Sequence, residues 1–164
     1  MLKPGFEKVG IEETKIQEEK VMQITRIRAK VRFDYRGKPR PSRFFFGGKS
    51  TEEVAGELRY QQAALWRNVP IQGVLVENIE LGEIYTVFDE EVDDDVAFAP
   101  LELDVVADCL ENLVLFAARE EFRRLQIREP ERIVMPRQEM ERIFFQMHEQ
   151  IKTQKYLKAK KYLD

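Results

Sequence analysis

The fold is decided by the stretch from Val21 to Lys49, VMQITRIRAKVRFDYRGKPRPSRFFFGGK. Its odd positions from Thr25 to Tyr35 are mostly apolar, and its even positions from Arg26 to Arg36 are mostly cationic. Successive side chains of a β-strand point to opposite faces of the sheet, so this alternation predicts a strand with one apolar face and one basic face. The alternation extends back to Val21, which predicts an unusually long strand.

A loop and a second, shorter strand follow the alternation. Gly37 tolerates a positive φ angle, and Pro39 and Pro41 lack the backbone N–H that a sheet requires. Residues 44–46 are all Phe and are followed by Gly47 and Gly48, which is typical of a short strand that ends at a turn. We therefore predict a basic β-hairpin formed by the two strands.

Positive charge is concentrated in the same stretch. Residues 24–49 contain nine cations and a single carboxylate, which is a net charge of +8. Clustered Lys and Arg bind nucleic acid by releasing its counterions, but a basic patch without a recognised motif is more often a solvated face that meets acidic side chains. The candidate anion- or nucleic-acid-binding residues are Arg26, Arg28, Lys30, Arg32, Arg36, Lys38, Arg40, Arg43 and Lys49.

A helix and two strands are expected next. Ser50 and Glu53 fit a capping box, and apolar residues at helical spacing continue to residue 69, before Pro70. Residues 71–76 and 83–88 predict two strands or one longer bent strand. Residues 77–104 contain eleven carboxylates and no Lys or Arg, so this segment complements the basic stretch either within one sheet or between subunits.

The last part of the chain predicts two further helices. Residues 104–127 are apolar nearly all round, which indicates a helix covered on more than one side or placed at a subunit interface. Residues 131–135 predict a short strand, and Pro136 suits the start of a helix whose basic tail frays or packs against an acidic surface. The candidate interface residues are Leu115, Phe122, Phe144, Met147 and Ile151.

The order of these elements predicts an α+β fold with a mixed or antiparallel sheet. Counted from Arg43 the order is strand, helix, strand, strand, helix, strand, which is that of a ferredoxin-like βαββαβ core, here with an extra C-terminal helix. A chain of 164 residues with 43% hydrophobic residues suits one core domain. We expect an N-terminal arm over residues 1–20, the core over 21–135, and an amphipathic helix with a basic tail over 136–164.

No catalytic, metal or cofactor motif is present in the expected form. The Gly-Lys-Ser at residues 48–50 lacks the glycine of a phosphate-binding loop, because Arg43 stands there. The acidic loop has Asp94 where a calcium loop needs glycine, and His148 is the only histidine. We therefore expect no metal and no cofactor, and enzymatic activity is disfavoured.

The composition also bears on location and partners. Cys109 is the only cysteine, so an internal disulfide is excluded, and the longest apolar run, residues 113–118, is far too short to span a bilayer. The N-terminus shows no apolar segment of a signal peptide, so we expect a cytoplasmic protein without a membrane partner.

These features predict a non-enzymatic binding or assembly protein. It would self-associate or dock to a protein partner through complementary basic and acidic surfaces and apolar helices. The alternative is a nucleic-acid-binding module that uses the basic hairpin over residues 26–43. A third hypothesis, a small-molecule sensor, requires an apolar pocket near Gln62 and Trp66.

Overall fold

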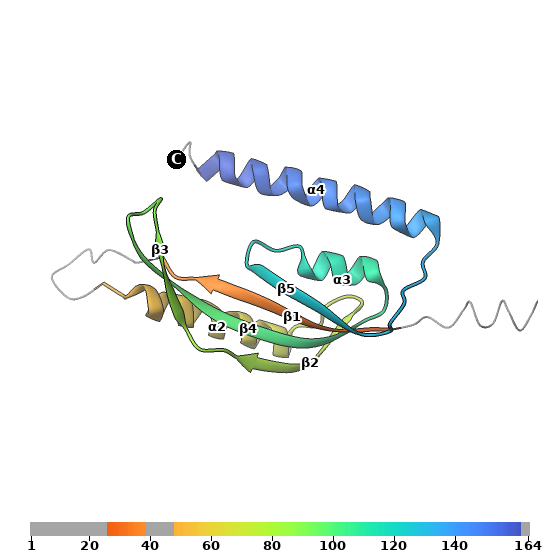
Figure 1. Cartoon of the computed structure of the whole chain (residues 1–164), viewed down its shortest axis with the longest axis horizontal. Coiled ribbons are helices and arrows are strands. Elements are labelled where there is room, and N and C mark those ends of the chain that lie inside the picture. Colours follow the sequence, from red (N-terminus) through yellow and green to blue (C-terminus); the bar gives the residue numbers. More distant parts are fainter. Residues whose placement is uncertain (1–25, 39–47, 162–164) are drawn as a thin grey trace, which may run out of the picture.

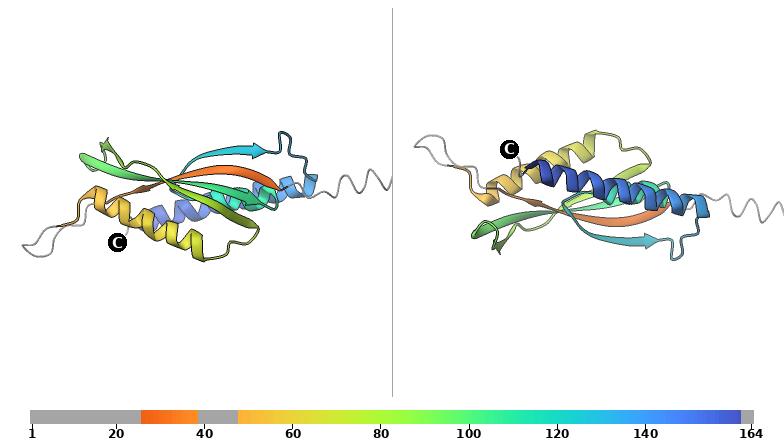
Figure 2. Two further views of the ribbon diagram at one scale, coloured as in Figure 1. Left: turned by 90° about the horizontal axis from the view of Figure 1, so that it is seen from below. Right: turned by 90° about the horizontal axis from the view of Figure 1, so that it is seen from above.

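A computed structural model describes residues 26–38 and 48–161 of the chain. In this part, five strands form one antiparallel sheet, and helices lie on one side of it, which confirms the α+β class (Figures 1 and 2). The elements in chain order are β1 (Ile27–Arg36), α2 (Thr51–Asn68), β2 (Val74–Leu81), β3 (Tyr85–Asp89), β4 (Asp94–Ala107), α3 (Leu110–Ala117), β5 (Phe122–Glu129) and α4 (Arg137–Lys161).

The strand order across the sheet is β2-β4-β1-β5. β3 continues the line of β2 along the same edge of β4, with Leu81 opposite Leu101 and Tyr85 opposite Phe98. The connection from β1 through α2 to β2 therefore passes over β4, and the connection from β4 through α3 to β5 passes over β1. β1 thus pairs with two strands from the second half of the chain, whereas β3 and β4 are consecutive strands joined by a short turn.

The alternation in β1 is confirmed. Its odd residues from Ile27 to Tyr35 are buried under the helices and lie opposite the odd residues of β4, such as Leu101 and Leu103. Its even cations, Arg28, Lys30 and Arg32, lie on the other face of the sheet, which no described helix covers (Figure 2). The apolar odd residues and the cationic even residues of β1 therefore lie on opposite faces of the sheet, as the alternation predicted.

The predicted hairpin is not confirmed. Residues 44–46 lie outside the described residues, as does the extension of the strand toward Val21. β1 pairs instead with β4 along its whole length and with β5 from Arg28 to Phe33, so both of its edges have other partners over that range. Both partners come from the second half of the chain, and no local turn signal could point to them.

The ferredoxin-like order is not confirmed in the form expected either. Its proposed first strand, residues 44–46, is not described, and its proposed last strand, residues 131–135, forms no strand. The helix expected over residues 104–127 is also wrong, because that range holds the end of β4, all of α3 and most of β5. β4 alternates between apolar and acidic residues only from Leu101 to Val105; residues 96–101 and 105–107 are apolar at both parities, which obscured the strand.

Helix α2 begins as predicted. The Ser50 hydroxyl accepts a hydrogen bond from the Glu53 backbone N–H at 3.2 Å, and the Glu53 carboxylate accepts one from the Ser50 N–H at 2.9 Å, so the capping box is complete. The helix ends at Asn68, close to the predicted residue 69. Arg59, which the sequence did not single out, is buried on its inner side and donates to the carbonyl oxygens of Gly82, between β2 and β3, and of Pro100.

The two strands predicted after α2 are present with shifted bounds. β2 extends to Leu81, beyond the predicted residue 76, and β3 begins at Tyr85 rather than at residue 83. The C-terminal helix α4 is also present. Its basic tail, which was expected to fray or to pack against an acidic surface, remains helical to Lys161. Residues 89–94 connect β3 and β4 as a tight acidic turn.

Candidate functional site

The uncovered face of the sheet carries a ladder of ion pairs between β1 and its neighbours. The Arg28 guanidinium lies 2.9 Å from a Glu77 oxygen and 3.8 Å from a Glu129 oxygen. The Lys30 ammonium lies 3.0 Å from Glu80 and 3.2 Å from Glu102. The cations of β1 therefore pair with carboxylates of β4 and β5, its neighbours in the sheet, and with carboxylates of β2, which lies on the far side of β4.

Most of the candidate cations that the structure describes have a carboxylate partner. Arg26 lies 4.0 Å from Asp108, while Arg36 pairs with Asp89 and Lys49 with Glu57. Lys49 is next to α2 rather than on the sheet face, and Lys38 is exposed at the end of β1. Arg40 and Arg43 lie outside the described residues.

Asp34 is the centre of this face. It is only 4% exposed, and its carboxylate accepts hydrogen bonds from Arg32 at 2.8 and 3.2 Å and from the Tyr85 hydroxyl at 2.6 Å. Arg123 lies 3.5 Å from the same carboxylate and also stacks over the Phe98 ring at 5.2 Å. A buried carboxylate with two guanidinium groups and a hydroxyl is a satisfied structural cluster.

Hydrogen bonds to carboxylates raise the pKa values of two cations on this face, which keeps their ion pairs charged. Hydrogen bonds to Glu80 and Glu102 raise the pKa of Lys30, and the hydrogen bond to Asp34 raises the pKa of Arg32. Burial and the hydrogen bond to Asp34 raise the pKa of Tyr85. Lys30 and Arg32 therefore stay charged and Tyr85 stays neutral at physiological pH.

Replacing Asp34 tests this cluster. We expect Asp34→Ala to lower the free energy of unfolding by about 2 kcal/mol, because two guanidinium groups lose their shared carboxylate. The cost is below that of a fully buried pair because the Arg32 and Arg123 side chains are 31% and 50% exposed and can turn toward water. Urea denaturation measures it, with exposed Asp95→Ala as the control; equal losses in both variants would contradict the structural role of Asp34.

In the sequence, Asp34 stands out only as the single carboxylate of the basic stretch. Asp34 occupies an even position of β1 where every neighbouring even residue is a cation, and that exception could have pointed to it. Arg123 and Tyr85 were missed because nothing in the sequence places β5 or β3 near residue 34. The nucleic-acid alternative stays a prediction: its described cations would have to leave carboxylate partners, and a gel shift at low salt tests it.

A second feature is the apolar surface of α4, here called the α4 surface and defined as Met140, Phe144, Met147 and Ile151. These residues recur at spacings of four, three and four, so they lie along one side of the helix, and all four are exposed. Helix α4 packs mainly against α3 (Figure 1). Ile143 is buried at this contact, and Glu111 of α3 accepts hydrogen bonds from Arg142 and Gln146.

The other two candidate interface residues, Leu115 and Phe122, lie on α3 and β5. Leu115 is on a helix, α3, as predicted, and its side chain is partly exposed. Phe122 is on the edge strand β5 rather than on a helix, and its ring contacts Phe33 in the core. The five candidate interface residues thus come from three elements, α3, β5 and α4.

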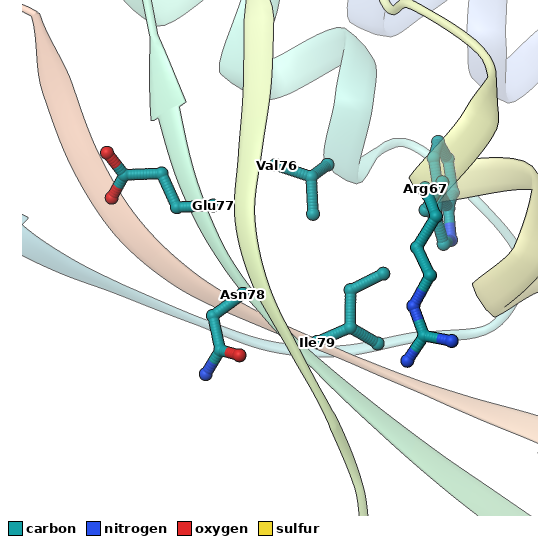
Figure 3. Close-up of a pocket in the computed structure, with 6 residues that line it drawn as sticks. Arg67, Val76, Glu77, Asn78 and Ile79 are labelled. Atoms are coloured by element: carbon teal, nitrogen blue, oxygen red, sulfur yellow. The ribbon is translucent and has the colours of Figure 1, made fainter.

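One shallow pocket of about 280 Å³ opens between the end of α2 and the edge strand β2. Val76 and Ile79 point toward Arg67 on one side of β2, whereas Glu77 and Asn78 point to the other side (Figure 3). Trp66 also lines this pocket but is itself packed against Phe33 and Phe116. The polar groups around it do not converge on one point, so it lacks the arrangement typical of a small-molecule site.

Within residues 26–38 and 48–161, no three His, Cys, Asp or Glu side chains are placed to hold a metal ion. None of the helices in that part combines the length and apolarity needed to cross a bilayer. Comparisons of the chain with protein-family models, with curated proteins and with solved structures find no match.

Proposed function

We propose that this chain is a non-enzymatic assembly protein that docks to a protein through the α4 surface. The observation that carries the proposal is the exposure of four apolar side chains on one side of α4. Contiguous apolar patches on a folded protein mark interaction sites more often than isolated apolar residues do. Burial of the exposed part of Phe144 and Ile151 would favour a complex, at about 25 cal/mol per Å² of apolar surface removed from water.

The attachment of α4 to its own chain supports this role. A helix of 25 residues is about 37 Å long, whereas α3 has only 8 residues and spans about 12 Å. Most of α4 therefore extends beyond the helix on which it packs. Such a helix contributes little to the core of its own domain, and its amphipathic side is suited to a groove or helix of a partner.

The charged sheet face has a different part in the proposal. Its cations and carboxylates already pair within one sheet, so docking would depend on apolar contact at α4. Charged residues that flank an apolar contact set orientation and association rate more than affinity. The complementary charges of the sheet face would then stabilise the fold, and the apolar side chains of α4 would make the contact with the partner protein.

Two adjacent phenylalanines provide the test. Phe144 and Phe145 are both 66% exposed, but only Phe144 belongs to the α4 surface, and Phe145 points about 100° away around the helix. We expect Phe144→Glu to abolish association, seen as a shift to monomer or loss of a co-purifying partner in sedimentation velocity. Phe145→Glu should leave association unchanged.

The two variants also separate association from folding. Both positions are exposed in the single chain, so neither substitution should change the circular dichroism spectrum or the unfolding midpoint of the monomer. A wild-type protein that is monomeric at every concentration and purifies without a partner would contradict the proposal. Equal effects of the two variants on association would contradict the assignment of the docking side.

A further inference from the structure

β2 and β3 are two parts of one edge strand, with an extra residue between them. Leu81 lies opposite Leu101 and Tyr85 lies opposite Phe98, so residues 82–84 face only two residues of β4. Three residues opposite two is the count of a β-bulge in an antiparallel pair. Because side chains alternate along a strand, one extra residue turns every later side chain to the other face of the sheet.

This bulge decides which side chains of β3 reach the charged face. Leu81 lies on the helix side of the sheet, opposite a buried leucine of β4. Strict alternation from Leu81 would place Tyr85 and Asp89 on the helix side as well. With the extra residue they lie on the other face, where the Tyr85 hydroxyl donates to Asp34 and the Asp89 carboxylate pairs with Arg36.

A proline leaves the bulge one backbone hydrogen bond short. Directly opposed residues of an antiparallel pair exchange two N–H···O bonds at alternate positions. The Gly82 N–H donates to the Pro100 carbonyl at 3.1 Å, but Pro100 has no N–H with which to return the bond. The Arg59 guanidinium donates to the Gly82 carbonyl instead, and it also donates to the Pro100 carbonyl at 3.3 Å. Arg59 of α2 therefore supplies the donor that Pro100 lacks.

The surroundings of Arg59 fit this role rather than that of an ion pair. Its side chain is only 6% exposed, and no carboxylate in the described part of the chain pairs with it. A buried charge is costly unless hydrogen bonds compensate for its lost hydration, and here carbonyl oxygens accept them. Gly82 permits the close pairing, because an added Cβ would lie 2.9 Å from the Pro100 Cβ. Ile84 lies against Gly56, one helical turn before Arg59, so α2 holds the bulge at two points.

We infer that Arg59 locks the register of this edge, so that a side chain on the helix side of the sheet keeps Tyr85 and Asp89 on the charged face. Without Arg59 the partly buried Gly82 carbonyl loses this donor, which destabilises the bulged arrangement. β3 then frays or pairs without the extra residue, and in either state its side chains leave the charged face. The position of α2 and the Asp34 cluster are thereby coupled through the sheet.

Pro100→Ala provides a specific test, because alanine restores an N–H that can donate to Gly82. We expect Arg59→Met to raise the amide hydrogen-exchange rates of β3 by about tenfold or more relative to those of β1, as measured by NMR. In the double variant Arg59→Met/Pro100→Ala, the β3 rates should return close to those of the wild type. If Arg59→Met does not fold, recovery of a folded spectrum in the double variant supports the lock.

The double variant separates the lock from simple packing of the Arg59 side chain. A substitution in β4 cannot restore packing that is lost from α2. Equal acceleration of β3 exchange in the single and double variants would therefore overturn the inference, as would two variants that both fail to fold. Unchanged β3 exchange in Arg59→Met would overturn it as well.

Tyr85→Phe reports the face on which the β3 side chains lie. In the wild type it removes the hydrogen bond to Asp34 and should lower the urea midpoint of unfolding. In the Arg59→Met background that bond is already lost, so Tyr85→Phe should leave the midpoint unchanged. Tyr156→Phe, at a position 67% exposed on α4, is the control and should have no effect in either background. Additive effects of Arg59→Met and Tyr85→Phe would contradict the coupling.

Discussion

Replacing Phe33 with alanine is expected to lower the free energy of unfolding by about 3–5 kcal/mol. Phe33 is 0% exposed at the middle of β1, where the two crossover helices and the sheet meet. Its ring centroid lies 5.8 Å from that of Phe116, 6.3 Å from Trp66 and 6.5 Å from Phe122. Truncation removes contacts to α2, α3 and β5 together, and the surrounding backbone belongs to three elements that cannot all move inward.

Urea denaturation followed by the fluorescence of Trp66, the only tryptophan, measures this loss. Phe88→Ala is the matched control, because Phe88 on β3 is 56% exposed, and we expect a change within about 0.5 kcal/mol. Both variants should be compared at one protein concentration, since association would add to apparent stability. Equal losses in the two variants would contradict the central place of Phe33 in the core.

Replacing Gly37 with alanine is expected to cost about 3 kcal/mol or more, since overpacking of this severity exceeds the usual range. An added Cβ would lie 1.8 Å from the carbonyl oxygen of Thr51 and 2.9 Å from the backbone nitrogen of Ala55. Gly37 also joins three elements, because its N–H donates to Ala97 on β4 and its carbonyl accepts from the Thr51 hydroxyl. The end of β1 and the first turn of α2 would have to separate.

Gly56→Ala is the control for this prediction. Gly56 is within α2, and the nearest atom to an added Cβ is the Ile84 Cδ1 at 3.6 Å, an ordinary contact. Alanine in a helix interior is favoured over glycine by about 0.5–1 kcal/mol, so this variant should unfold at higher urea concentration than the wild type. If Gly37→Ala lowers the free energy of unfolding and Gly56→Ala raises it, the difference reflects the close approach of backbone atoms at Gly37. A Gly37→Ala variant as stable as Gly56→Ala would show that α2 does not approach β1 so closely.

Part of the candidate site could be predicted from the sequence. Parity placed Arg28, Lys30 and Arg32 together on one face of a strand, and the acidic run over residues 77–104 suggested where their partners would come from. The individual pairs could not be predicted, because each depends on the register between β1 and β4 and between β2 and β4. A shift of one residue in either register would send the charged side chains to the opposite face.

The α4 surface shows the converse case. The stripe that spacing alone predicts is Met140, Ile143, Phe144, Met147 and Ile151, but spacing does not distinguish a stripe that covers a core from one that stays exposed. Only the packed structure shows that Ile143 is buried while the other four side chains of the stripe are exposed. The sheet was already covered by α2 and α3, so α4 was left with an apolar side in solvent.

The sequence by itself determined the local features of this protein: the two-faced strand β1, the capping box of α2, and the helix that begins after Pro136. Each follows from residues within a few positions of one another, where side-chain periodicity and backbone hydrogen bonding decide the outcome. Only the tertiary structure decided that β1 lies between β4 and β5, that Asp34 receives Arg123 and Tyr85, and that α4 remains partly uncovered. Those outcomes depend on which distant strands share hydrogen bonds, and the energy that selects them arises from burial of the whole apolar face at once.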